Sequence, residues 1–260
     1  MLIAFQKMQA QGNDFVILDF VDRCLPEYDF PALARSICHR QFGVGADGLV
    51  TLEAADTADA RMIIYNSDGS RAEMCGSALR CVSRLLMDKF ARSEALVLTD
   101  SGLKQASSKE EDITVNMGSA RIVKADFPAD GFVGDLVDIG NPHYIIFCDT
   151  LSDDPHLKHG ASLEHHPAFP ASVNVHFVRV LSRKKMQMKI WEHACGATLA
   201  CGTGAASAVY SGIRKALLEH EVAVEVPGGM LKIIYQKDTD TLQLVGPVSY
   251  VFSGKYIWKI

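Results

Sequence analysis

The sequence consists of two halves that repeat the same landmarks in the same order. Gly12-Asn13-Asp14-Phe15 resembles Gly140-Asn141-Pro142-His143, and each is a Gly-Asn turn that leads into strand-like apolar residues. Cys75-Gly76-Ser77-Ala78 follows the first turn by 63 residues, and Cys201-Gly202-Thr203-Gly204 follows the second by 61. Further glycines and apolar runs recur at matching distances after each cysteine. Shared spacing rarely arises by chance, so the pattern indicates an internal duplication.

The duplication predicts an α/β (α+β) fold of two similar, pseudo-symmetric domains. Each half contains many short apolar runs that favour strands, and one run with helical spacing, over 76–90 and 202–220. We expect residues 1–119 together with 248–260 to form the domain that carries Cys75, and residues 120–247 to form the domain that carries Cys201. The last apolar run, 253–260, has no counterpart ending the first half, so we expect it to pair with the first domain.

Composition excludes several classes of partner. The chain of 260 residues has a formal net charge of −5 and only 8% aromatic residues, which argues against binding nucleic acid. No apolar run approaches the roughly 20 residues that a membrane span needs, and the first residues do not form a signal peptide. The seven cysteines are an odd number in a chain without such a signal, so we expect reduced thiols and a cytoplasmic location.

The two repeated cysteines stand immediately before the two expected helices. A helix start offers unpaired backbone N–H groups and a partial positive charge, which bind a carboxylate and lower the pKa of a cysteine there. Small residues after Cys75 and Cys201 let a ligand approach these N–H groups closely. They are Gly76, Ser77, Gly202 and Thr203.

Two such helix starts, facing each other across a pseudo-twofold axis, would place a thiol on each side of the carbon that bears the bound carboxylate. One thiolate can then remove the α-proton while the opposite thiol delivers a proton to the other face. The sequence therefore predicts an amino-acid racemase or epimerase that uses Cys75 and Cys201 and needs neither a cofactor nor a metal.

The motifs along the whole chain resemble those of the diaminopimelate epimerases. They include Gly12-Asn13-Asp14-Phe15, Tyr65-Asn66-Ser67-Asp68-Gly69, Cys75-Gly76, Gly140-Asn141-Pro142-His143, Val173-Asn174, Trp191-Glu192, Ala200-Cys201-Gly202-Thr203-Gly204 and Pro227-Gly228-Gly229. The resemblance implies that each domain is a barrel-like, mostly antiparallel sheet around a central helix. It also implies a homodimer, independence from pyridoxal phosphate, and diaminopimelate, a precursor of lysine and peptidoglycan, as the substrate.

The resemblance further implies the residues of the substrate site. Backbone amides of Gly76, Ser77, Gly202 and Thr203 would hold the α-carboxylate. The pocket would be lined by Asn13, Asn66, Asn141, Asn174 and Glu192.

The chain departs from the family pattern in two places. The first cysteine motif is usually Cys-Gly-Asn-Gly, whereas Ser77 and Ala78 stand here. The family has an arginine after the glutamate matching Glu192, and that arginine grips the distal carboxylate of diaminopimelate; His193 stands here instead. An imidazole cannot reproduce the bidentate contact of an arginine. Two substrates therefore remain open, diaminopimelate or an amino acid without a distal carboxylate, such as histidine, and His193 is predicted to contact the substrate side chain.

Other interpretations of these residues predict different chemistry. Gly43-Val44-Gly45-Ala46-Asp47-Gly48 matches a dinucleotide motif, but a strand follows it where that motif needs a helix, so we expect a turn. Cys75 and Cys81, like Cys195 and Cys201, are six residues apart, which is wider than the usual spacing of zinc ligands. The histidines between residues 156 and 166 lie in a polar stretch and are expected to be solvated.

Two other classes of protein could use the same residues. A non-catalytic amino-acid-binding protein would keep the helix starts and asparagines but would not need two thiols. A cysteine hydrolase would need one cysteine with a histidine base. The presence of a cysteine at both equivalent positions favours the racemase.

Overall fold

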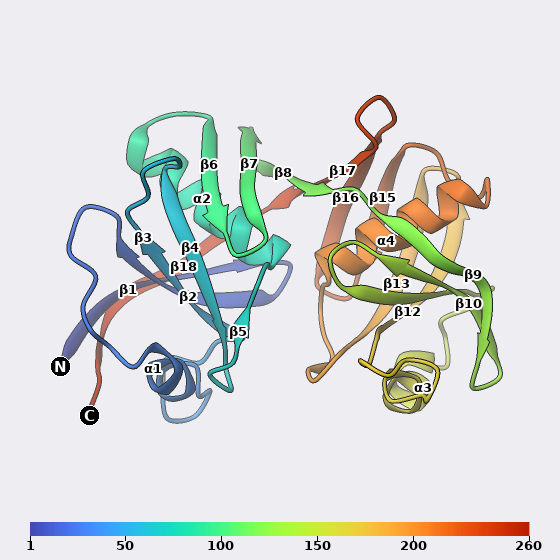
Figure 1. The fold of residues 1–260 in the computed structure, drawn as a ribbon, viewed down its shortest axis with the longest axis horizontal. Coiled ribbons are helices and arrows are strands. Elements are labelled where there is room, and N and C mark those ends of the chain that lie inside the picture. Colours follow the sequence, from blue (N-terminus) through green and yellow to red (C-terminus); the bar gives the residue numbers. More distant parts are fainter. Residues whose placement is uncertain (260) are drawn as a thin grey trace. The chain divides into compact units, whose positions relative to one another are not determined.

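The computed structural model describes residues 1–259 and divides the chain into two compact units (Figure 1). Unit 1 comprises Met1–Val115 and the segment from Pro247, and unit 2 comprises Asn116–Gly246. No helix in the described part of the chain is both long enough and apolar enough to span a bilayer.

Unit 1 is a curved, mostly antiparallel sheet with two helices. Its strands pair antiparallel except for β2 with β3 and β4 with β6, which run parallel. The elements are β1 (Leu2–Ala10), β2 (Asn13–Phe20), α1 (Phe30–Ile37), β3 (Gly48–Glu53), β4 (Ala60–Asn66), β5 (Arg71–Ala72), α2 (Gly76–Phe90), β6 (Glu94–Thr99), β7 (Gly102–Lys109), β8 (Asp112–Gly118) and β18 (Ser249–Ile257).

Unit 2 repeats this order of pairings strand for strand. Its two parallel pairs, β11 with β12 and β13 with β15, fall at the equivalent places. The elements are β9 (Arg121–Ala129), β10 (Phe132–Asp138), β11 (Pro142–Phe147), α3 (Pro155–Glu164), β12 (Asn174–Ser182), β13 (Lys185–Glu192), β14 (Gly196–Ala197), α4 (Gly202–Arg214), β15 (Glu221–Val226), β16 (Gly229–Gln236) and β17 (Thr241–Pro247). The predicted fold class, two similar halves of mostly antiparallel strands around a helix, is confirmed.

The helix that follows each cysteine lies inside its own sheet. Helix α2 packs against β1, β2, β4, β6 and β7, and α4 packs against β10, β11, β12 and β16 (Figure 1). The first turn of α4 is rich in glycine and alanine, and these residues are buried. Small side chains allow the helix to approach the surrounding strands closely. The start of each helix is therefore fixed by the core of its unit.

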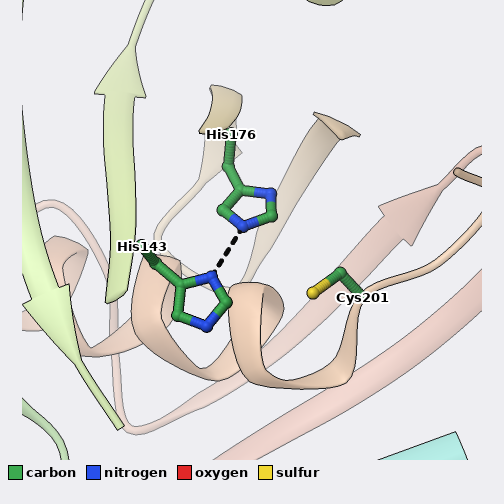
Figure 2. Close-up of side chains that lie close together, drawn as sticks. All are labelled: His143, His176 and Cys201. Carbon is green, nitrogen blue, oxygen red and sulfur yellow. Dashed lines mark hydrogen bonds between the residues drawn. The ribbon is translucent and has the colours of Figure 1, made fainter. Parts of the chain in front are cut away.

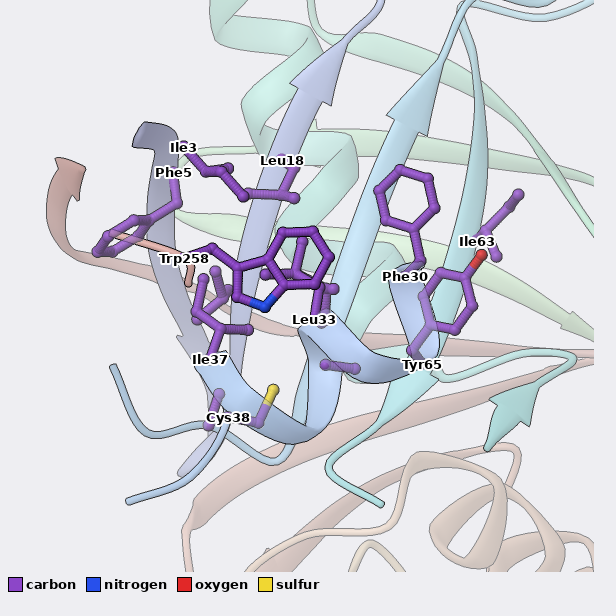
Figure 3. Close-up of a cluster of buried hydrophobic side chains, with 14 residues drawn as sticks. Ile3, Phe5, Leu18, Phe30, Leu33, Ile37, Cys38, Ile63, Tyr65 and Trp258 are labelled. Carbon is purple, nitrogen blue, oxygen red and sulfur yellow. The ribbon is translucent and has the colours of Figure 1, made fainter. Parts of the chain in front are cut away.

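The C-terminal strand is grouped with unit 1. Strand β18 runs antiparallel to β1, with Leu2 opposite Ile257. Beyond β18, Trp258 enters a buried cluster with Ile3, Leu33 and Ile37, which joins α1 to the sheet (Figure 3). In unit 2 the place beside the equivalent strand, β10, is taken by β9.

Two expectations about helices were wrong. Helix α4 ends at Arg214 rather than near His220, because Ala216 adopts a left-handed φ of 58° and turns the chain, so that Leu218 packs over Gly212. The stretch expected to be a solvated loop contains α3, which begins at Pro155, and His156 is buried in it. Apolar residues are sparse in α3, so its sequence lacks a clear helical period. The expected turn over residues 43–48 is confirmed, since β3 begins at Gly48.

Candidate active site

Cys75 is the N-cap residue of α2. Its backbone is extended, with φ −142° and ψ 119°, and its carbonyl accepts the first helical hydrogen bond from the Leu79 N–H. Gly76 and Ser77 form the buried first turn. Early N–H groups of a helix have no partner within the helix. Those of Gly76 and Ser77 can therefore donate to an anionic ligand beside the Cys75 sulfur.

Two asparagines of unit 1 lie at the ends of strands. Asn13 begins β2, and its Nδ2 donates to the Cys75 sulfur across 3.8 Å. Asn66 ends β4, and its Nδ2 donates to Ser70 Oγ at 2.9 Å. The predicted Asn13 therefore contacts the predicted Cys75, whereas Asn66 is held by the turn that follows its strand.

Cys201 is the N-cap residue of α4, at the position equivalent to Cys75. Its backbone is also extended, with φ −132° and ψ 107°. Its sulfur accepts a hydrogen bond from the Gly204 N–H at 3.4 Å and lies 3.5 Å from Thr203 Oγ1. The thiol thus caps its helix and lies beside Gly202 and Thr203, which form the first turn.

The pKa of Cys201 differs from the sequence expectation. Burial raises it well above the usual value for a thiol, and the negative charge of Glu192 raises it further. Donors such as the Gly204 N–H lower it by less. The helix start alone favours a thiolate, but removal from water and a neighbouring carboxylate outweigh it. Cys201 is consequently a protonated thiol at neutral pH.

Glu192, at the end of β13, is hydrogen-bonded to Cys201 and is itself held in place. Thr198 Oγ1 donates to Glu192 Oε1 at 2.6 Å. Asn174 joins the neighbouring segments, because its Oδ1 accepts from the His193 N–H at 3.1 Å and its Nδ2 donates to the Pro142 carbonyl at 2.9 Å. The ends of β11, β12 and β13 are therefore fixed together beside α4.

Two buried histidines complete this side of the site (Figure 2). His143 Nε2 lies 2.9 Å from Asn141 Oδ1, and His143 Nδ1 lies 2.9 Å from His176 Nε2. Burial lowers the pKa of His143 to about 3, and burial together with the neighbouring His143 lowers that of His176 well below its usual value. Both imidazoles are therefore neutral at neutral pH.

His193 is anchored by a buried carboxylate. Its Nδ1 donates to Glu164 Oε1 at 2.9 Å, while the Ala194 N–H donates to the same oxygen and Trp191 Nε1 donates to Oε2. Burial opposes the ionisation of Glu164, but these three donors lower its pKa overall. Since Nδ1 is engaged and half of the side chain is exposed, Nε2 is the nitrogen that His193 can offer to a ligand.

Comparisons with known proteins identify the relatives of this chain. A profile of the diaminopimelate epimerases matches residues 5–123 and 136–251. Diaminopimelate epimerase of Desulforudis audaxviator is 39% identical, with 97% of this chain and 99% of the relative covered. The diaminopimelate epimerase of Methanothermobacter thermautotrophicus is 37% identical, with 97% of this chain and 98% of that relative covered. The chain belongs to the diaminopimelate epimerase family.

Membership in the diaminopimelate epimerase family makes the protein an isomerase, as predicted. Solved structures share the fold of the whole chain at low identity. A PhzF-family phenazine biosynthesis protein of Bacillus anthracis matches with a TM-score of 0.75 at 14% identity, covering 99% of this chain and 100% of that one. A hydroxyproline epimerase of Agrobacterium vitis matches with a TM-score of 0.73 at 14% identity, covering 98% of this chain and 92% of that one.

Three further residues lie in the candidate site and were not among the residues predicted from the sequence. They are Glu164, which anchors His193; His176, which pairs with His143; and Thr198, which holds Glu192. His176 resembled one more residue of an alternating strand, and Glu164 lay in a stretch expected to be solvated. Only His176 carried a usable signal, since it is a titratable residue two positions after Asn174 and therefore on the same face of the strand.

Proposed function

We propose that this protein epimerises diaminopimelate at its α-carbon, interconverting the LL and meso forms without a cofactor, with Cys75 and Cys201 as the two acid/base groups. One observation carries the proposal: a cysteine is the N-cap of each of two equivalent helices, α2 and α4. The names of the full-length relatives support the substrate.

The two cysteines lie in different surroundings, and we assign them different roles in the proton transfer. Cys201 is buried beside Glu192 and keeps its proton, which makes it the donor. Cys75 is less buried than Cys201 and its sulfur accepts from Asn13 Nδ2, and we assign it the role of the base. In this direction the Cα proton moves to Cys75, and the Cys201 proton moves to the opposite face of the same carbon. The reverse reaction exchanges the roles.

The helix starts would also stabilise the carbanion. The amides of Gly76, Ser77, Gly202 and Thr203 would donate to the α-carboxylate, and preorganised dipoles lower the barrier where negative charge develops. We assign Asn13, Asn66, Asn141, Asn174 and Glu192 to the remainder of the substrate pocket.

Single cysteine variants test the mechanism. Cys75→Ala and Cys201→Ala should each lose epimerase activity, measured as uptake of solvent deuterium at Cα, while their circular dichroism stays unchanged. Cys81→Ala is the matched control, because Cys81 is fully buried in α2 and lies outside the proposed chemistry. Full activity in either Cys75→Ala or Cys201→Ala would refute the pairing. Binding of the amino acid without deuterium exchange in the unaltered protein would instead indicate a binding module.

The anchoring of His193 supports a second candidate substrate, an amino acid without a distal carboxylate, such as histidine. Glu164 places a fixed negative charge beside His193, at the position from which the substrate side chain is expected to be contacted. His193→Arg should raise the activity on diaminopimelate if the natural substrate lacks that carboxylate. Efficient epimerisation of diaminopimelate by the unaltered protein would refute this candidate.

We further propose a cytoplasmic homodimer. Strand β18 supports the dimer, since Tyr250, Val251 and Phe252 are about half exposed on it and could be covered by a second copy. Light scattering coupled to size exclusion should give twice the mass of one chain. A monomeric mass at the concentration of the activity assay would refute the dimer.

A further inference from the structure

Three side chains that can ligate a metal ion meet beside the start of α4. His143 lies on β11 and His176 on β12, and the parallel register sets His143 opposite Asn174. His176 is two residues beyond Asn174, so both imidazoles project from the same face of the sheet. Cys201 reaches them from the helix (Figure 2). The topology of unit 2 thus gathers three ligands that are 33 and 25 residues apart in sequence.

The geometry of the three side chains suits a small ion. One ring nitrogen of each histidine and the Cys201 sulfur all lie within 4.8 Å of one another. The facing nitrogens, His143 Nδ1 and His176 Nε2, are 2.9 Å apart. Gly204 makes this possible, because a Cβ at that position would lie 2.4 Å from the His176 ring. All three ligand residues are buried, so an ion bound here would be shielded from water.

The tautomers of the histidines are compatible with metal binding. Asn141 Oδ1 accepts a hydrogen bond, so His143 carries its proton on Nε2 and directs a lone pair from Nδ1. A hydrogen-bonded partner on the far nitrogen is the usual support of a metal-bound histidine. The other nitrogen of His176, Nδ1, is buried without a hydrogen-bond partner. If the ring proton of His176 is carried on Nδ1, the lone pair of Nε2 is free to coordinate a metal ion.

Charge also favours a divalent cation. Glu192 is hydrogen-bonded to the Cys201 thiol, so a thiolate at Cys201 would bring two negative charges together. A dication would neutralise both. Sulfur and imidazole donors select Zn²⁺ over Mg²⁺ or Ca²⁺, which prefer oxygen.

We propose that Cys201, His143 and His176 form a binding site for Zn²⁺ that inhibits the enzyme reversibly. Binding forms a Zn–S bond and releases the thiol proton to solvent, with no change of oxidation state. Occupation of the site removes the proton that Cys201 would donate. The binding itself is independent of the proposed function, whereas the inhibition depends on it.

Co²⁺, which replaces zinc and gives a near-ultraviolet sulfur-to-cobalt absorption, tests the site. The full-length protein, stripped with a chelator, should bind one Co²⁺ with that absorption and release protons, and Zn²⁺ should displace it. His176→Gln should weaken binding at least tenfold. His156→Gln is the matched control, since it removes another buried histidine of unit 2 and should bind as the unaltered protein does.

Two results would overturn the site: no sulfur-to-cobalt absorption in the unaltered protein, or an unchanged affinity in His176→Gln. Inhibition by Zn²⁺ should follow the same titration and be reversed by the chelator. Occupied sites with full epimerase activity would uphold the metal site and refute the catalytic role of Cys201. The two proposals therefore fail separately.

Discussion

Acidification from pH 7 to pH 5 should destabilise unit 2 through its paired buried histidines. His143 and His176 are fully buried, and burial lowers the pKa of His143 to about 3 and that of His176 well below its usual value. In the unfolded chain a histidine has a pKa of about 6.5. The unfolded state therefore binds more protons than the folded state below pH 6.5. The stability due to the neutral pair is complete above that pH and is lost as the pH falls.

The size of the effect follows from the two pKa values of His143. Between pH 7 and pH 5 the unfolded chain gains about 0.7 proton at this residue, while the folded chain gains almost none. Integration over this range gives a loss of about 2 kcal/mol in the free energy of unfolding. His176 contributes with the same sign. Carboxyl groups such as that of Glu164 titrate mainly below pH 5 even in the unfolded chain, so most of the change in this window comes from histidines.

The two tryptophans allow each unit to be followed separately. Trp191 lies in unit 2 and Trp258 in unit 1, which contains a single, exposed histidine, His39. In the Trp258→Phe variant, urea unfolding followed by Trp191 fluorescence, with a chelator present, should show the loss of stability of unit 2 between pH 7 and pH 5. Trp191→Phe should report a smaller change in unit 1.

A double variant tests whether these two histidines cause the pH dependence. His143→Gln with His176→Gln keeps hydrogen-bonding side chains but removes both titrating groups. Its stability should vary much less between pH 7 and pH 5. An equal loss in this variant would show that other groups cause the pH dependence.

Three further predictions concern the packing and the buried hydrogen bonds of unit 2. Gly204→Ala should lower the free energy of unfolding, measured in urea, by about 1–3 kcal/mol, because the new Cβ would lie 2.4 Å from the rigid His176 ring. Gly212→Ala is the control and should cost less, because its new Cβ meets the flexible side chain of Leu218. Gly160→Ala should displace the Trp191 ring, which would lie 2.4 Å from the new Cβ, and should shift Trp191 emission; unchanged emission would contradict this contact. Glu164→Gln should cost about 1–3 kcal/mol. When the amide oxygen keeps the bonds to His193 and Ala194, the NH2 group faces Trp191 Nε1 and cannot accept from it. An equal cost in a Trp191→Phe background would show that this hydrogen bond is not the cause.

Local signals in the sequence determined the plan of the fold. Two cysteines followed by small residues and a helical run predicted the starts of α2 and α4, which the structure places at Gly76 and Gly202. The repeated spacing predicted two similar halves, because equal segments with equal patterns form equal strands and helices. The partners of residues in a turn or helix start lie close by in sequence, so these features could be read without a structure.

Tertiary structure alone decided the environment of the site. The sequence predicted a lowered pKa for Cys201, but burial and Glu192 raise it. The roles of His176 and Glu164 could not be predicted from the sequence, because they depend on distant partners. His176 contacts His143, 33 residues away, and Glu164 contacts His193, 29 residues away. Burial and long-range contacts arise only when the strands have paired around the helix. The sequence therefore determined where the thiols stand in the chain, and the folded core determined which protons they hold.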